Sequence, residues 1–139
     1  MTNFNSFVPG FNQVLTAEGW RELSIYNHKT PVLTLDAGMK IQYLVPKVVS
    51  KHYYEGRVIT LDMGHATAAL KPSSNVLTRA GIKKAKDITK EDRLNRYYLS
   101  QEVEHVDIYE WEGSMYSLFF GSPLFIPIKL NNDYLLIEV

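Results

Sequence analysis

Four histidines are the side chains of this sequence best suited to proton transfer or metal binding near neutral pH: His28, His52, His65 and His105. They lack the close spacing that is typical of ligand pairs. A zinc-type site would need three or four donors converging from separate strands. Scattered surface or turn histidines are therefore the favoured interpretation, and the sequence predicts no metal site.

Cysteine is absent from the 139 residues, which excludes disulfides, thiolate zinc sites and cysteine nucleophiles. Lys plus Arg and Asp plus Glu number 15 each, so no net charge attracts the chain to nucleic acid or to an acidic membrane. The basic stretch from Lys83 to Arg96 is interrupted by acidic residues and lacks interleaved aromatic side chains. We therefore expect it to be a solvated face. No cofactor is predicted, and the expected partners are proteins.

The elements that position these side chains are mostly strands. Short β-branched or aromatic runs separated by Gly, Asn, Asp and Pro predict strands at 32–35, 41–45, 57–61, 106–111, 115–120, 125–130 and 134–139. Residues 36–38 and 131–133 should form hairpin turns, the first relying on the positive φ that Gly38 tolerates. Sparse apolar residues at 82–94 predict only a turn or a short helix. The fold class expected is all-β.

One domain spanning residues 1–139 is predicted, because the length suits a single core and no Gly-, Ser- or Pro-rich linker divides the chain. The first residues lack a signal peptide, and the most apolar segment, 118–128, is broken by Gly121, Pro123 and Pro127. We expect no membrane span, and the compartment stays open.

The tripeptide Val-Leu-Thr occurs at 14–16 and again at 76–78, each time followed by two residues, a glycine, an apolar residue and a basic one. The offset is 76 − 14 = 62 residues. The pair Glu-Gly at 55–56 and at 112–113 repeats with an offset of 57. Two similar halves, roughly 6–65 and 66–139 after a short extension at 1–5, predict a pseudo-two-fold β fold rather than a solenoid.

Three blocks of the sequence resemble, in order, those of Hint domains, the fold of inteins and of the autoprocessing half of hedgehog proteins. Residues 6–23 resemble the opening block, 70–88 the block that typically contains Thr-Pro-Asp-His, and 112–139 the closing blocks. The resemblance covers the chain from about Ser6 to Val139. It implies an all-β fold with internal pseudo-symmetry.

The resemblance also implies a reaction, in which a Cys or Ser at the place of Ser6 attacks the preceding carbonyl. A serine needs a base and an oxyanion-stabilising donor beside it. The family's threonine and histidine are replaced by Lys71 and Ser74, and the acidic residue near the end by Ser117. A serine cannot replace imidazole as a proton donor. The terminal His-Asn pair is replaced by Glu138 and Val139, and asparagine cyclisation cannot occur at valine.

The resemblance therefore implies a degenerate Hint fold in which these six positions are vestigial and no residue is catalytic. The function expected is a non-catalytic structural, assembly or protein-binding module, such as a phage capsid or tail component in a virion. Homo-oligomers or larger assemblies are its expected form. One alternative is an autoprocessing protein in which Ser6 cleaves after Asn5, helped by His65 or by a partner. A second alternative is a regulatory protein that binds a single partner.

Overall fold

A computed structural model describes residues 4–62, 67–95, 100–130 and 133–139. Strands account for nearly all the regular structure of these residues, and their only helix is the 3₁₀ turn η1 (Ala85–Asp87). The expected all-β class is confirmed. No helix among the described residues has the length and apolar character needed to cross a membrane.

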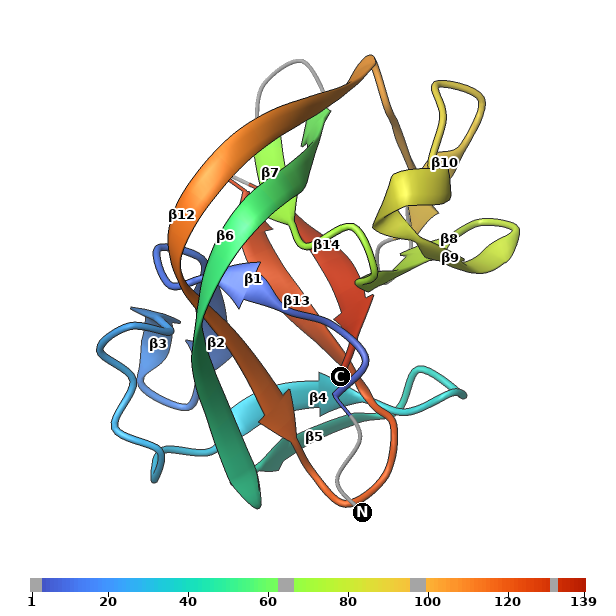
Figure 1. Cartoon of the computed structure of the whole chain (residues 1–139). Coiled ribbons are helices and arrows are strands. Elements are labelled where there is room, and N and C mark those ends of the chain that lie inside the picture. The colour runs from blue at the N-terminus through green and yellow to red at the C-terminus, as the bar shows by residue number, and fades with distance from the viewer. Residues whose placement is uncertain (1–3, 63–66, 96–99, 131–132) are drawn as a thin grey trace.

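A four-stranded sheet has the order β1-β12-β6-β7. Its strands are β1 (Val8–Pro9), β12 (His105–Phe119), β6 (Val48–Asp62) and β7 (Thr67–Leu70). Strands β6 and β12 are each 15 residues long and pair antiparallel along their whole length, which makes the long ribbon visible in Figure 1. The prediction of separate strands at 106–111 and 115–120 was wrong, because the ladder continues through Gly113.

Gly113 keeps this strand unbroken because it has no side chain. Its φ of +152° lies in the region that L side chains rarely adopt, and a Cβ there would lie 2.7 Å from the Trp111 ring. The Trp111 ring lies against Gly113, where a larger residue would leave it no room.

The larger sheet follows the order β11-β10-β8-β14-β13-β2-β4-β5, with β3 paired to β2 and β9 paired to β8. Its strands are β2 (Gln13–Thr16), β3 (Gly19–Glu22), β4 (Val32–Leu35), β5 (Ile41–Leu44), β8 (Asn75–Thr78), β9 (Gly81–Lys84), β10 (Arg93–Asn95), β11 (Ser100–Glu102), β13 (Phe125–Leu130) and β14 (Asp133–Glu138). The expected hairpins β4–β5 and β13–β14 are both present. Residues 131 and 132 of the second turn lie outside the described part.

The β4–β5 turn differs from its prediction in one respect. The residue with positive φ is Met39, at 64°, and not Gly38. The Asp36 carboxylate accepts hydrogen bonds from the backbone N–H groups of Gly38 and Lys40, each at 2.9 Å. These bonds stabilise a left-handed conformation at a residue that does not favour it.

The repeated tripeptides form two hairpins with the same register, β2–β3 and β8–β9. Thr16 pairs with Gly19 in the first, and Thr78 pairs with Gly81 in the second. In each hairpin the threonine hydroxyl donates to the glycine carbonyl, at 2.6 and 2.7 Å, and both glycines have positive φ. The local repeat is therefore structural. A two-fold relation between the halves 6–65 and 66–139 stays a prediction.

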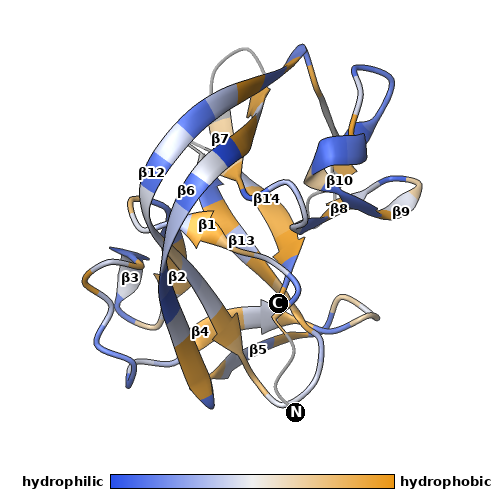
Figure 2. Cartoon of the chain, viewed as in Figure 1, coloured by the Kyte–Doolittle hydropathy of each residue, from blue (hydrophilic) through white to orange (hydrophobic). Residues whose placement is uncertain are grey.

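Backbone hydrogen bonds outside these hairpins repeat with the same offset of 62 residues. Leu23 N–H donates to Asn12 O at 2.9 Å, and Ala85 N–H donates to Ser74 O at 2.8 Å. The main core is made of buried side chains from both sheets, whereas a second cluster contains Leu35, Leu77, Phe125 and Leu136. In Figure 2 the apolar colour concentrates on β13 and β14, while much of the β6–β12 ribbon is polar.

Candidate functional site

Ser6 lies just before β1 and is 1% exposed. Its hydroxyl donates a hydrogen bond to the main-chain carbonyl of Glu138 and accepts one from the Asn75 N–H at 2.9 Å. A second, longer contact runs from Ser6 Oγ to Asn75 O at 3.3 Å. The hydroxyl therefore connects the beginning of the chain to strands β8 and β14.

Ser74 lies beside Ser6, but its hydroxyl bonds to Phe7, the residue that follows Ser6. Its Oγ accepts from Phe7 N–H at 3.0 Å and donates to Phe7 O at 2.9 Å. The side chain is fully buried. Because one hydroxyl satisfies both backbone groups of Phe7, Ser74 fixes the strand that follows the predicted junction.

Asn75 is a site residue that the sequence interpretation missed. Its backbone N–H reaches Asn5 O at 3.3 Å as well as Ser6 Oγ, so one donor serves the carbonyl and the hydroxyl of the junction. Its Nδ2 donates to Glu138 Oε1 at 2.9 Å. Most of the contact is made by a backbone group, which no side-chain pattern could have identified.

Lys71 contacts the same segment through its backbone N–H, which donates to Phe7 O at 3.0 Å. Its ammonium lies between two aromatic rings, 5.1 Å from the Phe7 centroid and 5.0 Å from the Tyr54 centroid. These are cation–π distances, and they direct the charge away from Ser6 towards the ribbon.

His52, on β6, is the second residue that was missed. Its ring packs edge-on against Phe7, with centroids 4.7 Å apart. Burial, and secondarily the positive charge of Lys71, hold the pKa of His52 below its ordinary value. The imidazole is therefore neutral at pH 7. It is far from Phe7 in sequence, so only the strand pairing brings the two together.

Of the six predicted positions, Ser6, Lys71, Ser74 and Glu138 meet around Phe7 and Asn75. Ser117 and Val139 make no hydrogen bond to Ser6 in the described part of the chain. Ser117 is buried on β12, and its Oγ has no partner among the described residues. Val139 exchanges backbone bonds with Leu124 at 2.8 and 3.1 Å. His65 lies outside the described residues.

The polar groups that touch Ser6 are backbone carbonyls and a backbone N–H, and the Glu138 carboxylate bonds to Asn75 Nδ2. An amide carbonyl is not a base at neutral pH, so none of these contacts removes the hydroxyl proton. Among the described residues, no group of three His, Asp or Glu side chains could hold a metal ion.

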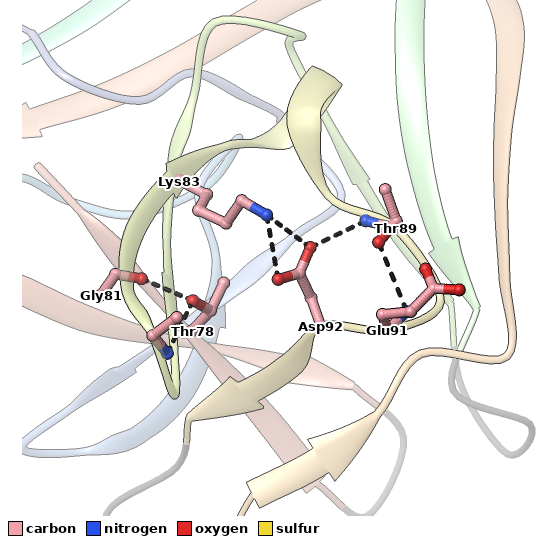
Figure 3. A network of polar contacts seen from close by, with 7 residues as sticks. Thr78, Gly81, Lys83, Thr89, Glu91 and Asp92 are labelled. Carbon is pink, nitrogen blue, oxygen red and sulfur yellow. Dashed lines mark hydrogen bonds and ion pairs between the residues drawn. The ribbon is translucent and has the colours of Figure 1, made fainter.

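The basic stretch has a polar network of its own (Figure 3). The Lys83 ammonium binds both carboxylate oxygens of Asp92, at 2.9 and 3.0 Å, and Asp92 also accepts from Thr89 N–H. The short helix η1 lies within this stretch, and Ile82 belongs to β9. The prediction of a turn or short helix at 82–94 is therefore correct for η1 and wrong for the residues of β9 and β10.

An apolar hollow of about 150 Å³ lies on the larger sheet beside the edge strand β5. The sequence did not point to it, because its side chains come from six strands. They are Leu15, Trp20, Leu33, Leu35, Ile41, Pro127 and Tyr134.

No protein-family model and no curated protein matches the chain. Solved structures do match it. A bacterial intein-like domain from Clostridium thermocellum has a TM-score of 0.82 at 13% identity, covering 99% of this chain and 100% of its own. A KlbA intein precursor from Methanococcus jannaschii has a TM-score of 0.79 at 12% identity, covering 100% and 94%. The AceL NrdHF class 3 split intein, as a splice-inactive variant, has a TM-score of 0.73 at 11% identity, covering 96% and 97%. The protein therefore has the intein-like Hint fold.

Proposed function

We propose that this Hint-type domain is a non-catalytic module for protein binding or assembly. The observation that carries the proposal is the position of the Ser6 hydroxyl, which donates its proton to the Glu138 carbonyl. A serine becomes nucleophilic when a base takes that proton. At Ser6 the proton instead helps to hold the first strand against the last one.

The rate contributions of the catalytic groups that Ser6 lacks favour a chain that is not cleaved. General acid–base assistance contributes roughly 10²–10⁴ in rate, and one oxyanion donor roughly 10²–10³. The place where the resemblance implies an imidazole is occupied by Ser74, whose hydroxyl is already bonded to Phe7 on both sides. A serine there cannot protonate a departing nitrogen at neutral pH.

Intact-mass measurement tests this part of the proposal. After long incubation with hydroxylamine, which captures an ester intermediate, the protein should remain at 16.0 kDa. The Ser6→Ala variant is the matched control and should behave identically. A species shortened by residues 1–5 in the wild type and missing in Ser6→Ala would overturn the proposal.

Autoprocessing is the second candidate, and one observation favours it. The Asn75 N–H lies within reach of both Asn5 O and Ser6 Oγ, so one donor for a developing oxyanion is in place. The hydroxylamine experiment separates this candidate from the first.

The proposed partners are other proteins, including copies of this chain, and a repeated part of a phage particle is one setting for such a module. The exposed apolar side chains support a binding role, since Ile25 is 71% exposed and Tyr53 62%. Purification of the protein at its native abundance, together with whatever it binds, distinguishes an assembly component from a regulatory protein. A homo-oligomer or a lattice supports assembly, one defined hetero-complex supports a regulatory protein, and a free monomer at all concentrations contradicts both.

A further inference from the structure

One face of the β6–β12 ribbon is exposed at alternate residues of both strands. Side chains two apart on a strand share a face, and residues in register across the ladder share it too. Six exposed side chains therefore lie together, and we call them the outer ribbon face: Tyr53, Glu55, Arg57, Ile108, Glu110 and Glu112. Two large apolar side chains, Tyr53 and Ile108, are 62% and 59% exposed at its two ends.

The charges of this face are unbalanced. Three carboxylates and one guanidinium give the six side chains a net charge of −2 at pH 7, and Lys51, the preceding exposed residue of this face on β6, adds one positive charge. Arg57 lies 3.6 Å from Glu110, whereas Glu55 stands directly opposite Glu112 in the register. Like charges directly opposite are destabilising in a sheet. The Tyr53 hydroxyl donates to Glu112, but Glu55 has no partner among the described residues. A cation brought by another molecule would relieve this repulsion.

The same chain carries a surface of the opposite sign. Residues 79–93, which we call the basic lobe, contain six Lys or Arg and three Asp or Glu, a net charge of +3. Lys83 is bound to Asp92, so it does not contribute a free charge (Figure 3). Lys84 and Lys86 are exposed. Ile82, two residues before Lys84 on the edge strand β9, is 46% exposed.

The two surfaces are matched in kind, since each combines exposed apolar side chains with charge of one sign. Figure 1 shows the ribbon arching along one side of the domain and the β8–β10 lobe projecting from the other. The start of β12 at His105 lines a hollow together with Lys90 and Arg93 of the basic lobe, but the six residues of the outer ribbon face do not line it. A contact of that face with the lobe is therefore expected between molecules. A symmetric contact of ribbon with ribbon would oppose acid to acid, which leaves a head-to-tail arrangement.

We propose that the outer ribbon face of one molecule binds the basic lobe of a second copy, head to tail. This inference rests on the proposed function, because it names the surface and the partner of the assembly. Ile82 contacts Tyr53, at one apolar end of the face, and Lys84 and Lys86 approach the pair Glu55 and Glu112. A head-to-tail contact of this kind builds rings if the rotation closes and filaments if it does not.

Sedimentation equilibrium with charge-reversed variants tests it. At ~0.05 M salt the wild-type weight-average mass should rise at least about twofold above 16.0 kDa with concentration, and at ~1 M salt it should return to 16.0 kDa. Glu55→Lys with Glu112→Lys, and separately Lys84→Glu with Lys86→Glu, should each stay at 16.0 kDa. Mixing these two variants should restore association, because the ribbon face made basic in the first variant can bind the lobe made acidic in the second.

Glu18→Lys with Glu22→Lys is the matched control for the variant Glu55→Lys with Glu112→Lys. It changes the net charge by the same amount, at exposed positions of the β2–β3 hairpin. It should associate like the wild type. The proposal is overturned by a wild type that stays at 16.0 kDa at low salt, by equal loss in the control, or by no recovery on mixing. A purified chain that is intact but monomeric defeats this inference and leaves binding to a different protein standing, whereas Ser6-dependent cleavage defeats the proposed function.

Discussion

Replacing Ser6 by alanine should destabilise the domain, and the chain should remain uncleaved. The substitution removes the donor to Glu138 O and the acceptor of the Asn75 N–H, while leaving both backbone groups in place. A net hydrogen bond contributes about 0.5–1.5 kcal/mol, and a buried group left without a partner costs about 1–3 kcal/mol. Asn75 N–H keeps its longer contact with Asn5 O, so we expect a loss of about 2–3 kcal/mol.

Urea unfolding followed by circular dichroism measures this loss. With a slope of about 1–3 kcal/mol per molar urea, the midpoint should fall by roughly 0.7–3 M. Ser24→Ala is the matched control, because Ser24 is exposed and its only side-chain bond to a described residue is a 3.4 Å contact with Glu22. Its stability should change by less than about 0.5 kcal/mol. A Ser6→Ala variant as stable as Ser24→Ala would refute the view that this hydroxyl holds the two strands together.

Three further changes test other parts of the fold. Gly113→Ala should destabilise by about 1–3 kcal/mol, measured by urea unfolding, because it combines a positive φ with contact on the Trp111 ring; an unchanged midpoint would contradict this. The pKa of His52 is lower in the folded chain than in the unfolded chain, so as the pH falls the unfolded chain takes up a proton at His52 before the folded chain does. The free energy of unfolding should therefore decrease as the pH falls below about 6.5. His52→Leu should flatten that part of the pH profile, and an identical slope would refute the assignment. Asp36→Ala should cost about 1 kcal/mol by loss of the turn bonds to Gly38 and Lys40, and a smaller effect than Asp87→Ala would argue against it.

The strands that the sequence predicts best are those buried in the larger sheet. Strands β4 and β13 begin and end where the apolar runs do, because Pro, Asp or Asn flanks each of them. The ribbon was predicted as separate pieces, since its middle residues are exposed and polar on one face. Only the pairing of β6 with β12 makes these residues strands, and that pairing joins segments far apart in the sequence.

The residues of the candidate site could also be predicted only in part. Ser6, Ser74 and Glu138 could be placed by resemblance to ordered blocks of a known family, and the structure brings them within hydrogen-bond contact of one segment. Asn75 could not be foreseen, because its backbone N–H makes the contact. His52 approaches Phe7 only through the sheet register, and no local pattern encodes that.

The contact between Ser6 and Glu138 joins residues 132 apart in sequence, so it closes a loop that contains nearly the whole chain. Closing a loop costs about (3/2)RT ln n in entropy, and one hydrogen bond of about 0.5–1.5 kcal/mol does not offset that cost. Strand β14 must first pair with β8, where Glu138 lies opposite Asn75. The Ser6 hydroxyl therefore reaches its site only when the fold is complete. In the complete fold that hydroxyl donates its proton to the Glu138 carbonyl.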